Sequence, residues 1–169
     1  ELPEDVILPI QTDNSEQLLE TIIQDVLIPD HKMTEQHRRW VGYTLKRILE
    51  SLFQNSTLEK QQVYITIFLS FFSTKEWDEW ATFVLIDTSV ALPFQSCTQE
   101  QLKQLLYFML NFVPNQTDEI QLSALRLCDD MIAEAGLSEL IYEEAVEFIN
   151  RLHFHKNNVS IDYLLFKTK

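Results

Sequence analysis

The stretch STLEKQQVYITIFLSFF, residues 56–72, decides the fold class of this chain. Ser56 followed three residues later by Glu59 forms a capping box, which satisfies free backbone N–H groups where a helix begins. The residues after it are apolar almost all round, as in a helix that is buried on several sides. Their β-branched and aromatic side chains also suit a strand, but the capping box and the length favour a helix. We expect this helix, over 56–72, to be the most buried element of the fold.

The same kind of start signal recurs along the rest of the chain. Ser73 and Thr98 each precede a Glu or Gln by three residues, Thr34 and Thr117 are further N-cap candidates, and Gly136 has the place of a helix-ending glycine. The predicted helices cover 15–28, 34–54, 56–72, 73–86, 98–113, 117–135 and 138–152. Seven helices with short connections, which place neighbours antiparallel, predict an all-α fold.

The ends of the chain differ from this pattern. Residues 1–14, ELPEDVILPIQTDN, contain two prolines and no helical period. We expect an extended N-terminal arm that lies on the domain, because Val6, Ile7, Leu8 and Ile10 would otherwise expose much apolar surface. Residues 15–155 are predicted to form a single α-helical domain, and residues 156–169 a short helix or a C-terminal arm.

The starts of alternate helices repeat at a spacing near 40 residues. The cap candidates Thr57, Thr98 and Ser138 lie 41 and 40 residues apart. The caps of the alternate helices, Thr34, Ser73 and Thr117, lie 39 and 44 residues apart. Such a period is the signature of a repeat of helix pairs.

This period resembles that of HEAT and armadillo repeats, over residues 34–155. The third pair is the most similar: Pro114 precedes an acidic helix start, and LSALRLC, residues 122–128, follows. The resemblance implies that helix pairs stack on one another. A non-repetitive helical bundle is the alternative, because any all-α chain with 15-residue helices and short loops yields similar periods.

Composition restricts the class of protein. The net charge of −13 disfavours nucleic acid as the main partner, and two glycines in 169 residues leave little room for phosphate-binding loops.

The sequence also bears on the compartment. No signal peptide is visible, and two cysteines, Cys97 and Cys128, are too few for a disulfide framework; both are expected to be small buried residues. We therefore expect an acidic intracellular protein, cytoplasmic or nuclear. The apolar runs are too short for a membrane span, so no membrane partner is expected.

Catalytic and metal-binding patterns are missing from the sequence. None of the common nucleotide-binding, hydrolase or metalloprotease motifs occurs. Asp129, Asp130 and Glu134 are neighbours on one predicted helix, which is typical of a solvated face, and His153 and His155 fit a solvated helix end. We expect a non-enzyme with no cofactor and no metal ion.

The helix over 34–54 is the basic element of this acidic chain. Its basic side chains are His37, Arg38, Arg39, Lys46 and Arg47. Arg39 and Lys46 are seven residues apart and share one face, where they are expected to point to solvent and bind an acidic or phosphorylated peptide. Internal pairing with the protein's own carboxylates is the competing interpretation.

The segment WDEWATF, residues 77–83, is the second candidate for binding. Trp77, Trp80 and Phe83 lie three residues apart, on one stripe of the predicted helix. Such a stripe is either core or a partly exposed anchor for a partner.

These observations predict a non-enzymatic protein–protein interaction domain, a scaffold or adaptor that binds a peptide or an amphipathic helix of another protein. The candidate partner-binding residues are His37, Arg38, Arg39, Lys46, Arg47, Trp77 and Trp80. The alternative is a nucleic-acid-binding helical domain that uses the basic helix and the C-terminal lysines, which requires these cations on one face.

Overall fold

The computed structural model describes residues 15–28, 33–72, 77–136 and 139–152, and these residues form helices with no strand among them. The prediction of an all-α fold is confirmed. The helices are α2 (Ser15–Leu27), α3 (Glu35–Gln54), α4 (Leu58–Ser70), α5 (Glu79–Thr88), α6 (Gln99–Phe112), α7 (Asp118–Ala135) and α8 (Glu139–Asn150), with two 3₁₀ turns, η1 (Ser89–Ala91) and η2 (Phe94–Ser96). The predicted arm over 1–14 and the C-terminal segment over 156–169 lie outside the described residues.

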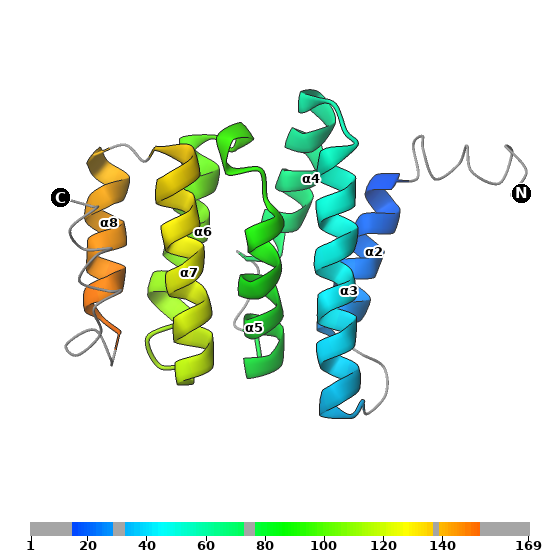
Figure 1. Cartoon of the computed structure of the whole chain (residues 1–169), viewed down its shortest axis with the longest axis horizontal. Helices are drawn as coiled ribbons and strands as arrows, with labels where there is room; N and C mark the ends of the chain where they lie inside the picture. The colour runs from blue at the N-terminus through cyan, green and yellow to red at the C-terminus, as the bar shows by residue number, and fades with distance from the viewer. Residues whose placement is uncertain (1–14, 29–32, 73–76, 137–138, 153–169) are drawn as a thin grey trace, which may run out of the picture.

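The helices are arranged in two rows (Figure 1). In one row α2 contacts α4, α4 contacts α6 and α6 contacts α8; in the other α3 contacts α5 and α5 contacts α7. Contacts of α2 with α3 and of α6 with α7 join the rows. Successive helices thus alternate between the rows, and each row grows in chain order along the long axis of the molecule.

Most helix starts agree with the sequence because a cap is a local structure. The side chains of Thr34, Thr98 and Thr117 each accept a hydrogen bond from the backbone N–H three residues on. The capping box of Thr98 and Gln101 is complete, with bonds of 3.2 and 2.8 Å. At the end of α7, Gly136 has φ +63°, a left-handed conformation in which glycine avoids the strain of a Cβ.

Two helix starts differ from the prediction. The N-cap of α4 is Thr57, which accepts from the N–H of Lys60, whereas the Ser56 hydroxyl donates to the carbonyl of Leu52 in the preceding helix. Helix α5 begins after Asp78, whose Oδ1 accepts from the Ala81 N–H at 2.8 Å. The predicted helix over 73–86 is therefore not continuous: Trp77 and Asp78 lie before α5, so Trp77 is not on its stripe, and residues 73–76 lie outside the described residues.

The core differs from the prediction in one respect. Helix α5 is buried over most of its length, at Ala81, Thr82, Val84, Leu85, Ile86 and Thr88. Helix α4 buries Tyr64, Ile65, Phe68 and Leu69, while Thr66 and Ser70 face solvent. The most buried helix is therefore α5, which contacts α3 and α7 in its own row and also α2 and the 3₁₀ turn η1.

Helix α3 packs through Gly42, Leu45, Leu49 and Phe53. Trp40 is 63% exposed and so lies off this buried face. Gly42 faces α5: a Cβ built there would stand 3.5 Å from Cη2 of Trp80 and 3.6 Å from Cγ2 of Val84. Both distances are ordinary van der Waals contacts.

We therefore expect Gly42→Ala to raise the free energy of unfolding by about 0.5–1 kcal/mol, because alanine inside a helix restricts the unfolded chain and fits the space. Urea denaturation of the full chain measures the change. Gly136→Ala is the matched control: the same substitution at φ +63° should lower stability. A destabilised Gly42→Ala variant would mean that α3 and α5 pack more tightly than these distances indicate.

The two cysteines are not reactive in this fold. Cys128 is fully buried, as predicted, and Cys97 is half-buried, with its Sγ 3.6 Å from the carbonyl of Pro93. Burial raises the pKa of both thiols to about 12, and the neighbouring carboxylate of Asp129 adds to the effect at Cys128. Neither thiol has the lowered pKa that a nucleophilic cysteine needs.

Candidate functional site

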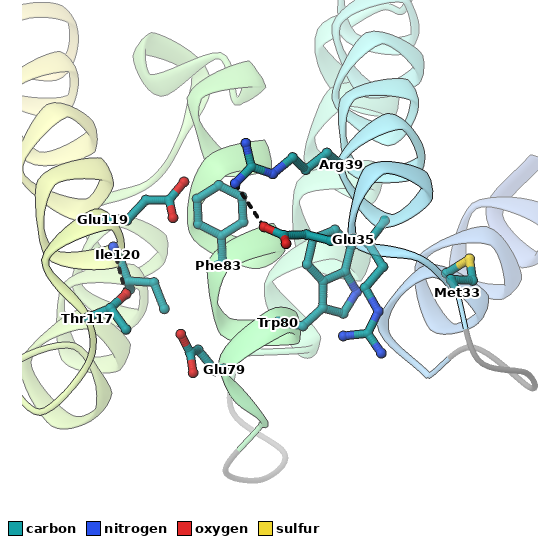
Figure 2. Close-up of a pocket in the computed structure, with 10 residues that line it drawn as sticks. Met33, Glu35, Arg39, Glu79, Trp80, Phe83, Thr117, Glu119 and Ile120 are labelled. Atoms are coloured by element: carbon teal, nitrogen blue, oxygen red, sulfur yellow. Dashed lines mark hydrogen bonds and ion pairs between the residues drawn. The ribbon is translucent and has the colours of Figure 1, made fainter.

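A pocket of about 490 Å³ lies where the first turns of α3, α5 and α7 meet (Figure 2). Each of these helices begins at a cap, Thr34, Asp78 or Thr117, and presents its next residues to the pocket. Its lining residues are Met33, Glu35, Arg38, Arg39, Glu79, Trp80, Phe83, Thr117, Glu119 and Ile120.

The apolar part of the pocket comes mainly from α5. Trp80 and Phe83 are both half-buried, with ring centroids 6.4 Å apart. Ile120 of α7 and Met33 before α3 extend this surface on either side. The Trp80 ring lies against α3 at Gly42, where a Cβ would stand 3.5 Å from its Cη2. Apolar side chains are thus partly open to solvent at a place shared by three helices.

Charged side chains of both signs surround this apolar surface. Arg39 donates to Oε1 of Glu35 at 3.0 Å, and the two side chains are 64% and 82% exposed. An exposed pair of this kind contributes only about 0.3–0.5 kcal/mol and can open for a ligand. Glu79 and Glu119 bring two more carboxylates from α5 and α7, as Figure 2 shows. The side of the pocket formed by α3 is therefore the only side with cations among the lining residues.

Two buried donors at the pocket lack an acceptor within the described part of the chain. They are the indole N–H of Trp80 and the Nε–H of Arg38. The guanidinium carbon of Arg38 lies 5.9 Å from the centre of the Trp80 ring, in cation–π range. A buried donor without a partner costs about 1–3 kcal/mol, so these two donors lower the stability of this region.

Three of the seven residues predicted from the sequence to bind a partner line the pocket. Arg38, Arg39 and Trp80 line it. Trp77 does not, because its indole donates to the carbonyl of Phe71 at 2.8 Å and its ring packs against the core. His37 is exposed, and its backbone N–H closes the cap of Thr34.

The other two basic residues of α3 lie elsewhere. Lys46 is half-buried, which corrects the expectation that it points freely to solvent, and it lies near enough to Asp130 to lower the pKa of that carboxyl group. The pKa of Asp130 is nevertheless raised overall, because burial is the largest influence on it and Asp129 adds to the increase.

Arg47 lines a different groove, beside the start of α4.

The predicted solvated carboxylate face on α7 is therefore only partly solvated. Asp129 and Asp130 are half-buried, whereas Glu134 is exposed and has a pKa raised by desolvation and by Asp130. No group of three or more His, Cys, Asp or Glu side chains within the described ranges is arranged to hold a metal ion. His153 and His155 lie outside those ranges.

Sequence reasoning missed Glu35, Glu79 and Glu119 as pocket residues, whereas Phe83 belonged to the stripe proposed as an anchor. The signal was present in the spacing of the caps: Thr34, Asp78 and Thr117 are 44 and 39 residues apart. Helices that repeat at this spacing and occupy one row bring their first turns to the same edge. The caps Thr34 and Thr117 were predicted from the sequence, whereas Asp78 was not, and the meeting of the three turns follows only from packing.

None of the helices that the structure describes combines the length and the apolarity of a membrane span. Comparisons with protein-family models, with curated proteins and with solved structures find no match for this chain.

Proposed function

We propose that this chain is a non-enzymatic protein-interaction domain, in which the two rows of helices are stacked pairs of the HEAT or armadillo type. The pocket at the first turns of α3, α5 and α7 is its binding site, and the ligand is a short segment of a partner protein. The observation that carries the proposal is the partly open apolar surface of Trp80 and Phe83 inside a rim of charged side chains. Aromatic side chains in such surroundings are common anchors of protein interfaces.

The charges of the rim give the ligand an orientation. Arg38 and Arg39 stand on the α3 side, whereas Glu79 and Glu119 stand on the α5 and α7 side. A carboxylate or phosphate on the ligand is favoured near α3 and repelled near α7. The proposed ligand therefore inserts an apolar side chain against Trp80 and places an acidic or phosphorylated residue next to the two arginines.

The positions of the cations give no support to nucleic-acid binding. Arg38 and Arg47 are nine residues apart, which is half a turn beyond two full turns, so they lie on opposite sides of α3. Within the described residues Arg38 and Arg39 share their pocket with three glutamates. A phosphate backbone requires the cations on one continuous face.

We expect Arg39→Glu to weaken peptide binding about five- to tenfold, on the order of 1 kcal/mol, because it replaces an attraction with a repulsion at an exposed site. The probe is a peptide selected from a random displayed library on the full chain, with its affinity measured by titration calorimetry. Binding of the wild-type chain should weaken with salt, because screening is strong beyond about 10 Å at 0.1 M.

The matched control is Arg126→Glu, the same charge reversal at an exposed residue of α7 that does not line the pocket. It should leave the affinity unchanged. Lys46→Glu serves as a second comparison: it should lower the melting temperature, since it adds a negative charge near Asp130, and should affect binding little. Equal losses for Arg39→Glu and Arg126→Glu would contradict the proposed site.

A further inference from the structure

A second groove, of about 840 Å³, runs between the C-terminal half of α3 and the start of α4 and reaches the first residue of α2. Its lining residues are Ser15, Thr44, Arg47, Ile48, Ser51, Leu52, Asn55, Ser56, Thr57, Lys60 and Tyr64. It lies apart from the pocket at the first turns of α3, α5 and α7, with which it shares no lining residue.

The groove is basic and partly apolar in a protein of net charge −13. Two cations, Arg47 and Lys60, line it, and no carboxylate does among the residues that the structure describes. Arg47 is exposed and forms no ion pair with any described residue. Ile48 is 37% exposed, and Leu52 is half-buried beside it. This chemistry suits a segment that is both acidic and aliphatic.

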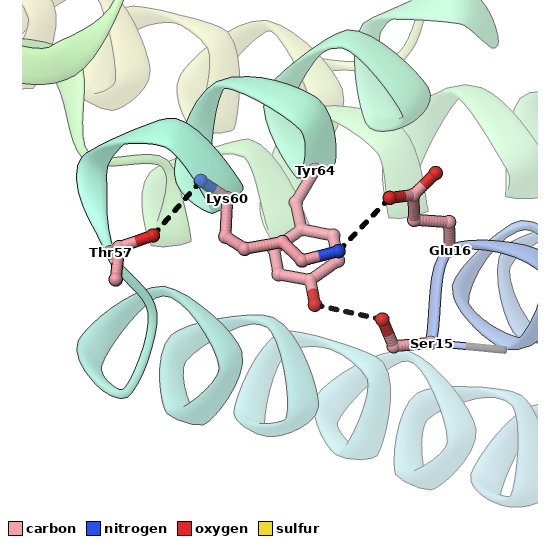
Figure 3. Close-up of polar contacts among 5 residues, drawn as sticks. All are labelled: Ser15, Glu16, Thr57, Lys60 and Tyr64. Atoms are coloured by element: carbon pink, nitrogen blue, oxygen red, sulfur yellow. Dashed lines mark hydrogen bonds and ion pairs between the residues drawn. The ribbon is translucent and has the colours of Figure 1, made fainter. Parts of the chain in front are cut away.

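The start of α2 is held at one end of this groove (Figure 3). The Ser15 hydroxyl and the Tyr64 hydroxyl are hydrogen-bonded at 3.0 Å, and Nζ of Lys60 is 3.0 Å from Oε1 of Glu16. Lys60 also lies 5.8 Å from the centre of the Tyr64 ring. The polypeptide that precedes Ser15 therefore joins the domain at the edge of the groove.

The sequence before Ser15 has the complementary chemistry. Residues 1–14 carry four carboxylates and no lysine or arginine. Prolines at 3 and 9 disfavour a helix there and favour an extended backbone. In an extended segment alternate side chains share a face, so one carboxylate and three aliphatic side chains align: those of Glu4, Val6, Leu8 and Ile10.

We propose that residues 4–10 dock in this groove on their own domain. Val6 and Leu8 cover Ile48 and Leu52, and the carboxylate of Glu4 lies toward Arg47. The lengths agree: the lining part of α3, residues 44–55, is about 17 Å long, which an extended segment of about five residues covers. The chain between Glu4 and Ser15 reaches at most about 36–40 Å, so the tether allows this position.

Hydrogen exchange of the full chain, read by mass spectrometry over residues 4–11, tests the proposal. The reference is the free peptide ELPEDVILPIQTDN under the same conditions. We expect these amides to exchange about tenfold or more slowly in the protein than in the peptide, since exchange of a docked segment requires it to open.

Two groove variants of the full chain locate the docking site. Ile48→Lys removes an apolar contact and Arg47→Glu repels Glu4, so either should return exchange over residues 4–11 to within about twofold of the peptide rate. Tyr43→Lys is the matched control, because Tyr43 is exposed on the same helix and does not line the groove. It should keep the wild-type protection. Circular dichroism verifies that all three variants are folded.

Three outcomes would overturn the proposal. Exchange of wild-type residues 4–11 at the peptide rate means that no docking occurs. Protection that survives both groove variants means that the segment lies elsewhere. Protection that falls on dilution, together with a dimer in sedimentation, means that the segment occupies the groove of a second copy.

Discussion

Replacing Phe68 with alanine should lower the free energy of unfolding by about 3–5 kcal/mol, the range for a fully buried aromatic side chain. Phe68 is 0% exposed and meets Phe72 edge to face, with ring centroids 5.3 Å apart. The ring centroid of Phe72 lies 4.8 Å from that of Phe108 in α6. The ring centroids of Phe108 and Phe112 are 5.1 Å apart. The lost ring would leave a cavity at one end of a series of rings that joins α4 to α6.

Urea denaturation of the full chain, followed by far-UV circular dichroism, measures this loss. Thr66→Ala is the control on the same helix, because Thr66 is exposed and its hydroxyl donates only to the carbonyl of Gln62 within α4. It should change stability by less than about 0.5 kcal/mol. A loss below about 1 kcal/mol for Phe68→Ala would show that the α4–α6 contact is not part of the cooperative core.

Helix starts were predictable where one local signal stood alone. Thr34, Thr98 and Thr117 each bind the backbone three residues on, so the chemistry that fixes them is contained within four residues. The start of α5 was not predictable in this way. Ser73 precedes Glu76 by three residues and so fits the capping-box pattern, whereas Asp78, which closes the first turn of α5, has Ala81 at that position.

The exposure of individual aromatic residues was less predictable than the helices themselves. Trp40 and Trp80 both lie in helical segments with an apolar stripe, yet Trp40 is 63% exposed and Trp80 is half-buried. Gly42 of α3 faces α5 and lies against the Trp80 ring, whereas Trp40 lies off the buried face of α3. That contact joins residues 38 positions apart, and no pattern within either helix specifies it.

The basic residues of α3 show the same limit. Sequence spacing correctly places Arg38 and Arg47 on a basic helix, but their neighbours come from other helices. Arg38 lies over Trp80 in one pocket, whereas Arg47 stands in a groove with Lys60 of α4. Charge patterning along one helix therefore indicated binding residues without showing that they belong to two separate surfaces.

The largest effect on binding is expected from Trp80→Ala. A central aromatic anchor commonly contributes about 2 kcal/mol or more, so affinity for the library-selected peptide should fall about 30-fold. Trp40→Ala is the matched control, since it removes the same side chain from an exposed position of α3 that does not line the pocket. It should leave the affinity within about twofold of the wild-type value, well below the hot-spot range.

Trp80 also packs against Gly42 and Arg38, so its loss will lower stability as well as affinity. Measuring the folded fraction at the temperature of the binding assay separates the two effects, because a purely structural role would reduce binding only in proportion to the unfolded fraction.

The indole N–H resonance of Trp80, assigned by its absence in Trp80→Phe, gives an independent readout. Because Trp80 lines the pocket and Trp40 does not, a peptide that binds there should shift this resonance and leave that of Trp40 in place. Equal affinity losses in the two alanine variants, with no shift of the Trp80 resonance, would place the partner on another surface of the domain.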